Sequence, residues 1–272
     1  MLLTCSAMKR ESRILPERSS SRLLAVGLAA AVVICGQFGA FGALSIKDLE
    51  KAAKKRGNIE EQYQLGMLYF NGEVEGKEAR HALSLFKKAE KGSIQAQHMV
   101  GVCYALGEGI KRNDKEAFKW YQKAANGGDQ VATFKVAACY EKGIGVEKSP
   151  ESALRWYRRL ADKDVMEAQY KVGLAYHLAK GIRKDYQEAA KWFRKAADQG
   201  HQESQFQLGG FYTIGQGVEK DVVEAYKWYS LAGAFGNQKA LERRKGLTRY
   251  GLNPAGIAKA KKLVEAFKPS SK

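Results

Sequence analysis

Tryptophan recurs in this chain at an interval of 36 residues, at Trp120, Trp156, Trp192 and Trp228. Leu85 extends the series backward by one interval of 35 residues. An aromatic residue directly follows each member of the series: Phe86, Tyr121, Tyr157, Phe193 and Tyr229. A sequence period of this length is typical of proteins built from stacked repeats, in which each unit buries the apolar face of its neighbour.

A second column of residues has the same period and lies upstream of the first. It holds a small residue in each copy: Gly66, Gly101, Ala137, Gly173 and Gly209. Three residues later each copy has a tyrosine: Tyr69, Tyr104, Tyr140, Tyr176 and Tyr212. Two columns in one register indicate that the chain contains five copies of one structural unit.

Each unit predicts two helices, which we call helix A and helix B. Helix A carries the column of small residues, and in the fourth copy Ala168, Val172 and Tyr176 fall on one helical stripe beside Gly173. A turn follows helix A, where glycine permits the positive φ that ends a helix. The turn positions are Gly107/Gly109, Gly143/Gly145, Ala179/Gly181 and Gly215/Gly217.

Helix B should begin at residues that favour the N-cap position, seven positions before each tryptophan: Asn113, Ser149, Asp185 and Asp221. Glu116, Glu188 and Glu224 lie three positions after a cap residue and predict capping boxes. Pro150 occupies the first helical position of one copy, where its missing N–H costs nothing. We expect helix B to bury its tryptophan against the next unit.

The N-terminal residues have the pattern of a targeting segment. Five basic residues (Lys9, Arg10, Arg13, Arg18 and Arg22) precede an uncharged run at 23–44. A basic stretch followed by an apolar one is typical of an export signal, and the run is also long enough to remain as a membrane anchor. The sequence leaves open a cleaved signal, a retained anchor and neither. We expect an exported protein that is periplasmic, anchored in the inner membrane facing the periplasm, or secreted.

The charge of the chain is strongly positive, with a formal net charge of +17. Residues 239–272 hold ten basic and two acidic side chains. A candidate basic patch is formed by Arg243, Arg244, Lys245, Lys259, Lys261 and Lys262. Such a patch could bind an anionic polymer or a membrane surface, or it could be a solvated end of the fold. Nucleic acid is disfavoured as the ligand because the chain carries an export signal.

Signals for chemistry are weak. The four histidines (His81, His98, His177 and His201) lack the spacing of metal ligands, and no nucleophile–base motif occurs. Cys103 and Cys139 are 36 residues apart, which places them on neighbouring helices too far apart for a disulfide and predicts buried free thiols. We therefore expect no enzyme, no cofactor, no metal and no small-molecule substrate.

The fifth copy, with Gln205-Phe206-Gln207-Leu208-Gly209, Tyr212, Gly215-Gln216-Gly217-Val218, Asp221 and Ala225-Tyr226-Lys227-Trp228-Tyr229, resembles the Sel-one-like repeat (SLR), a relative of the tetratricopeptide repeat. The resemblance covers residues 46–241. It implies a non-catalytic adaptor or scaffold of the bacterial cell envelope that binds a protein or peptide. Cysteine-rich relatives join the two helices of a repeat by disulfides, and that feature is absent here because the helix-B positions are Ala124 and Ala196.

The fold implied is all-α, a right-handed α/α solenoid of about five repeats preceded by an apolar N-terminal helix. The predicted repeats lie within 58–241, at 58–92, 93–128, 129–164, 165–200 and 201–236. Residues 1–44 are the signal peptide or membrane anchor, 45–57 an N-terminal capping helix, and 237–272 basic C-terminal capping helices.

In the related solenoids the A helices line the concave groove, so a partner would bind there. Three positions before the small-residue column lies a ring in every copy: Tyr63, His98, Phe134, Tyr170 and Phe206. Four positions after the column, the same side of helix A carries Phe70, Glu141 and His177. These residues could contact an extended peptide or a partner helix. They could equally pack within the fold.

Overall fold

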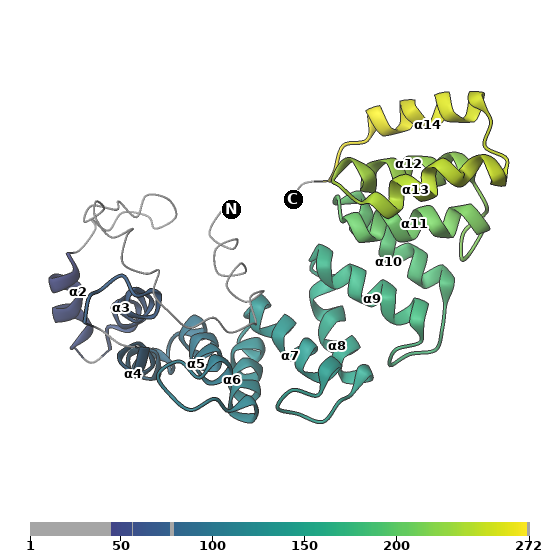
Figure 1. The fold of residues 1–272 in the computed structure, drawn as a ribbon. Helices are drawn as coiled ribbons and strands as arrows, with labels where there is room; N and C mark the ends of the chain where they lie inside the picture. Colours follow the sequence, from purple (N-terminus) through teal and green to yellow (C-terminus); the bar gives the residue numbers. More distant parts are fainter. Residues whose placement is uncertain (1–44, 56, 77–78, 271–272) are drawn as a thin grey trace, which may run out of the picture. The chain divides into compact units, whose positions relative to one another are not determined.

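The computed structural model describes residues 45–55, 57–76 and 79–270, and this part of the chain is helical throughout, with no strand (Figure 1). The predicted targeting segment at 1–44 lies outside the described residues. No helix among the described residues is long and apolar enough to span a bilayer.

The helices alternate as the repeat predicts. The A helices are α3 (Ile59–Asn71), α5 (Ile94–Leu106), α7 (Gln130–Lys142), α9 (Met166–Leu178) and α11 (Gln202–Ile214). The B helices are α4 (Ala79–Ala89), α6 (Asp114–Asn126), α8 (Pro150–Ala161), α10 (Tyr186–Asp198) and α12 (Val222–Ala234). Each A helix packs against the B helix of its own repeat, and each B helix packs against the next A helix. The predicted all-α solenoid is confirmed.

Short helices cover both ends of this stack. Helix α2 (Ile46–Ala53) packs on α3 and buries Leu49. At the other end α13 (Gln238–Lys245) and α14 (Pro254–Ala266) both pack on α12, with a 3₁₀ turn, η1 (Gly246–Tyr250), between them (Figure 1). The ring of Phe267, just after α14, lies 5.8 Å from the ring of Trp228. The last B helix is therefore covered although no further repeat follows it.

The predicted N-caps of helix B are confirmed, but the capping boxes are not. Asn113, Ser149, Asp185 and Asp221 each accept a hydrogen bond from a backbone N–H in the first turn. The backbone N–H of each cap residue already donates to the carbonyl of the column tyrosine on helix A, as Asp185 does to Tyr176 at 3.2 Å. The glutamates turn to a lysine three residues on instead, as Glu188 does to Lys191.

The glycine column on helix A lies directly under the ring that follows the tryptophan position. A Cβ on Gly173 would come within 2.7 Å of the Phe193 ring, and one on Gly209 within 2.5 Å of the Tyr229 ring. Glycine therefore allows the A and B helices of one repeat to approach each other with a full aromatic ring between them.

The second glycine of each turn joins one repeat to the preceding one. Gly145 has φ +71°, and a Cβ there would lie 2.0 Å from the carbonyl oxygen of Asp114, at the start of the preceding B helix. Gly217 makes the same approach to the carbonyl of Tyr186. Both the positive φ and the lack of space require glycine at this position.

The tryptophans are buried less evenly than expected. Trp192 is 6% exposed and Trp228 fully buried, whereas Trp120 and Trp156 are only partly buried. Each partly buried indole is covered by a cation three residues further along its helix. For Trp156 this is Arg159, whose guanidinium lies 4.5 Å from the ring centroid. A long basic side chain here replaces part of the protein cover that we expected from the next unit.

The two described cysteines are free and buried, which confirms the prediction for Cys103 and Cys139. Burial raises the pKa of both thiols, that of Cys103 to about 12. Thiols with raised pKa values are poor nucleophiles, so these two act as small apolar residues of the core.

Candidate functional site

The five predicted ligand-contacting rings occupy one equivalent place in the solenoid. Each packs against the aromatic residue on helix B of its own repeat, with centroid separations from 5.1 to 6.0 Å. The pairs are Tyr63–Phe86, His98–Tyr121, Phe134–Tyr157, Tyr170–Phe193 and Phe206–Tyr229. We call these five A-helix residues the ring ladder.

The ladder rings differ from their B-helix partners in exposure. All five are partly buried, whereas the partner rings are buried. Burial raises the pKa of the hydroxyls of Tyr63 and Tyr170. Each ladder ring therefore has part of its surface fixed against a core ring and part in solvent.

The polar members of the predicted site also make contacts within the fold. Glu141 accepts a hydrogen bond from the Tyr157 hydroxyl at 2.8 Å and lies 3.5 Å from the Lys171 ammonium. His98 lies 3.6 Å from the Asp129 carboxylate. These side chains are held in place, and they bring a carboxylate and an imidazole beside the ladder rings of the second and third repeats.

His177 and Phe70 lie deeper than the ladder. The ring of His177 packs among Tyr186, Phe193 and Phe211, at 5.3 to 6.4 Å between centroids. Its Nδ1 is buried without a hydrogen-bond partner, and burial lowers its pKa, with Lys184 adding to the effect. Phe70 contacts the core ring Phe86. Both residues serve packing more than the surface of helix A.

A hydrogen-bonded group at the start of α11 was not predicted. His201 is the N-cap of this helix and accepts from the Ser204 N–H through Nδ1, while Nε2 lies 3.0 Å from the Glu167 carboxylate. The bond to His201 holds the pKa of the Glu167 carboxyl below its usual value. The same imidazole lies 4.6 Å from the Tyr170 ladder ring. It fixes one ladder ring between two repeats.

A glutamine column on helix A was also missed, although it has the repeat period and could have been found by it. In four repeats the side-chain amide donates to a backbone carbonyl at the end of the preceding helix: Gln62 to Ala53, Gln97 to Glu90, Gln169 to Ala161 and Gln205 to Ala197, at 2.7 to 3.3 Å. The third repeat has Thr133 at this position. The glutamines join successive repeats by satisfying carbonyls that a helix end leaves without partners.

The predicted basic patch is divided between two helices. Arg243, Arg244 and Lys245 lie on α13, whereas Lys259, Lys261 and Lys262 lie on α14, and both helices pack on α12. The guanidinium of Arg244 donates to Ser230 and stacks over Tyr226 at 5.3 Å, so it is partly used by the fold. The three lysines of α14 are exposed.

Residues that could perform chemistry do not converge. Within the described part of the chain, no group of three or more His, Cys, Asp or Glu side chains could hold a metal ion. What repeats along the solenoid is the ring ladder.

Five consecutive segments, at 62–92, 94–129, 130–165, 167–201 and 202–236, match the family model of the Sel1 repeat. The chain belongs to the Sel1 repeat family. Each matched segment contains one A helix and one B helix of the structure. Sel1 repeat proteins are generally scaffolds for protein–protein interactions, and the repeat is typically non-catalytic.

Two solved structures resemble this Sel1 repeat protein closely. A protective antigen present in uropathogenic Escherichia coli strains, which displays an SLR fold, is 33% identical, with a TM-score of 0.67 over 82% of this chain. The match covers 48% of the E. coli chain, so this chain spans about half of that protein. A Sel1 repeat protein from Oxalobacter formigenes is 31% identical, with a TM-score of 0.61 over 84% of this chain and 96% of the other. A comparison with curated proteins finds no match.

Proposed function

We propose that this Sel1 repeat protein is a non-catalytic scaffold that binds an extended segment or a helix of a partner protein along its A helices. The observation that carries the proposal is the ring ladder, in which each of the five repeats holds a partly exposed ring against a core ring. The proposed contact residues are the ladder rings together with the adjacent Glu141.

The physics of the ladder favours binding. A ring that is already held by a neighbour loses little conformational entropy when a ligand covers its exposed part. Aromatic residues are also enriched among the few side chains that supply most of the binding energy at protein interfaces. One ring in every repeat provides contacts at regular intervals, as a long peptide or an amphipathic helix requires.

Site-specific photo-crosslinking tests the proposal. A benzophenone amino acid replaces either Tyr170 or Phe206 in the full chain, expressed in its native host, and irradiation should yield a discrete adduct with one protein. Phe235 is the matched control, because it is an aromatic residue, 62% exposed, at the end of α12 and outside the ladder. The same adducts from Phe235 as from the ladder positions would contradict binding along the A helices.

Alanine substitutions separate binding from packing. In the variant Tyr170→Ala, Phe206→Ala, the crosslink formed from a probe at Phe134 should be lost while the melting temperature falls only modestly. If the melting temperature falls as far as it does for Phe193→Ala, whose ring is fully buried, the ladder rings belong to the core and the proposal is wrong.

We also propose that the protein is exported to the cell envelope, which rests on the basic and apolar pattern of residues 9–44. Cell fractionation followed by N-terminal sequencing tests this. A mature chain that begins near residue 44 supports a cleaved signal, and an intact N-terminus in the membrane fraction supports an anchor. An intact chain in the cytosol would contradict export.

A second candidate function is binding of an anionic polymer or membrane surface by α14. It is favoured by the exposure of Lys259, Lys261 and Lys262 on one short helix. Affinity for vesicles containing anionic lipid should then fall steeply as salt is added. Replacing the three lysines with glutamine should abolish that binding, and an affinity that does not depend on salt would rule it out.

A further inference from the structure

The contact between the second and third repeats differs from the other contacts between repeats. Elsewhere a glutamine of helix A crosses to a carbonyl at the end of the preceding helix. Here Thr133 stands in its place, and its hydroxyl donates to the carbonyl of Asp129 in its own helix at 2.6 Å. The side chain that would cross between the repeats is missing.

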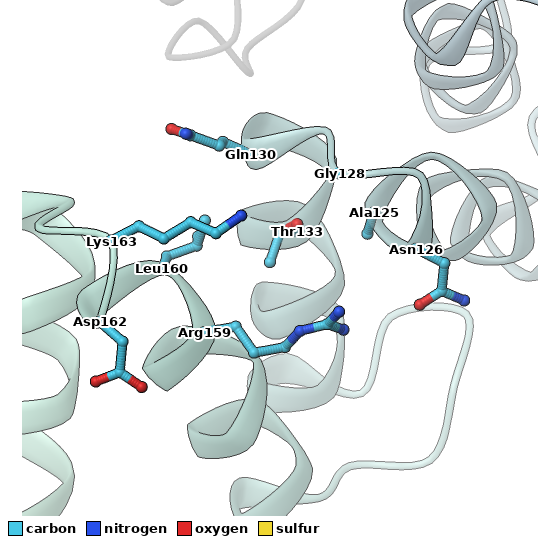
Figure 2. A pocket seen from close by; sticks show the side chains of 9 residues that line it. All are labelled: Ala125, Asn126, Gly128, Gln130, Thr133, Arg159, Leu160, Asp162 and Lys163. Carbon is cyan, nitrogen blue, oxygen red and sulfur yellow. The ribbon is translucent and has the colours of Figure 1, made fainter.

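A pocket of about 300 Å³ lies at this contact, lined by Ala125, Asn126, Gly128, Gln130, Thr133, Arg159, Leu160, Asp162 and Lys163 (Figure 2). None of the ladder rings lines it. By its place in the repeat, the carbonyl of Ala125 is the counterpart of those of Ala161 and Ala197, which accept from a glutamine. In the third repeat this carbonyl accepts only from backbone N–H groups of its own turn.

The other walls of the pocket supply an apolar floor and donors at its rim. Leu160 is 2% exposed and offers a surface for methylene groups. In the view of Figure 2, Arg159 and Lys163 extend on either side of Thr133, whereas Asp162 points away from it. Among the described residues Lys163 has no ion pair. The pocket thus joins an acceptor at its inner end, an apolar wall and cationic donors near its opening.

We propose that this pocket receives the side-chain carboxamide of a glutamine from a protein partner. The NH₂ group would donate to the Ala125 carbonyl, and the amide oxygen would accept from Lys163 or Arg159. A lysine or arginine is disfavoured as the occupant because both basic residues line the pocket. A glutamate is disfavoured because its carboxylate cannot donate to the carbonyl. That the glutamine belongs to a protein rests on the proposed function, whereas the preference for a carboxamide does not.

The test uses N-acetyl-L-glutaminamide as the probe, added to the ¹⁵N-labelled full chain and followed by NMR. Saturable shifts are expected at the amides of Gly128, Thr133 and Leu160. The matched compounds N-acetyl-glutamic acid amide and N-acetyl-norvalinamide should bind about tenfold more weakly, the size expected for one lost hydrogen bond. Free L-glutamine should also bind more weakly because its α-ammonium would meet Arg159 and Lys163. Equal shifts with norvalinamide, tighter binding of free glutamine, or no shifts at all would overturn the proposal.

Two variants place the binding in the pocket. Thr133→Gln restores the side chain of the other repeats, so it should abolish the shifts and raise the melting temperature by about 2–4 °C, as one added hydrogen bond would in a chain of this size. Thr133→Val keeps the pocket open and should keep the shifts. Loss of binding in Thr133→Val, or full binding in Thr133→Gln, would overturn the assignment. Neither result depends on the ring ladder, so this test and that of the proposed function can fail separately.

Discussion

Gly209 on α11 lies against the ring of Tyr229 on α12, so closely that a Cβ on the glycine would fall 2.5 Å from the ring. The same relationship joins Gly173 to Phe193. Where the third repeat has Ala137 instead, the ring is that of Tyr157. The smallest side chain on one helix and one of the largest on the other together set the distance between the two helices of a repeat.

Gly209→Ala should therefore destabilise the protein by about 1–3 kcal/mol, as overpacking of a well-filled core does. Gly210 is the matched control, because its neighbouring position in α11 leaves 3.6 Å to the nearest atom. Gly210→Ala should stabilise by about 0.5–1 kcal/mol through the lower entropy of the unfolded chain. Urea unfolding of both variants checks the prediction. Equal effects of the two substitutions would show that the ring does not limit the approach.

Ala179 ends α9 in the left-handed region, with φ 54°, where the other A helices have glycine. Ala179→Gly should raise stability by about 0.5–1 kcal/mol, because relief of the strained φ exceeds the added entropy of the unfolded chain. Gly72→Ala is the reverse change, at φ 73° with no atom within 4 Å of the added Cβ. It should lose a similar amount. Thermal melting measures both, and a loss of stability in Ala179→Gly would contradict the account.

Asp185 caps α10 by accepting from the N–H groups of Gln187 and Glu188. Asp185→Ala should cost about 1 kcal/mol, the usual value of a lost N-cap. Glu188→Ala should cost less than about 0.5 kcal/mol, because its carboxylate only pairs with Lys191 at the surface. Chemical denaturation compares the two. A larger effect of Glu188→Ala would restore the capping box that the sequence predicts.

Burial lowers the pKa of His177 below 6.5, and the charge of Lys184 lowers it further. Between the lowered folded pKa and 6.5 the unfolded chain binds the proton more readily, so this contribution to stability is complete above pH 6.5 and is lost as the pH falls through the folded pKa. His177→Phe, which copies Phe70 of the first repeat, should reduce that loss. Urea unfolding at about pH 7.5 and about pH 5.5 measures it.

The exposed His81 provides the control for this experiment, since it lies on the solvent side of α4. His81→Phe should leave the loss of stability between the two pH values unchanged. If it reduces the loss as much as His177→Phe does, the pH dependence does not come from the buried imidazole.

The repeat itself made most of the fold predictable. Tryptophan, glycine and tyrosine columns in one register require equivalent environments, so the order of helices, their N-caps and the free cysteines follow from local rules applied five times. The capping boxes were predicted by the same rules and are absent, because the tyrosine carbonyl of helix A takes the N–H that each box needs. That competitor is distant from the cap residue in sequence and close only in the folded repeat.

The candidate site was less predictable. The ring ladder could be located by position on helix A, but its contact with the B-helix rings could not, because a helical wheel shows which residues share a face and not what lies opposite. His201 could not be connected with Glu167, 34 residues away, for the same reason.

The sequence by itself determined that this protein is an α/α solenoid of five repeats, because its columns of ring, glycine and cap residue admit only one period. The tertiary structure decided how the repeats are joined, through the second glycine of each turn and the glutamines that cross to the preceding helix. It also decided where the series is interrupted. Thr133 differs from its counterparts by a few atoms in the sequence, and only packing between two helices turns that difference into a pocket.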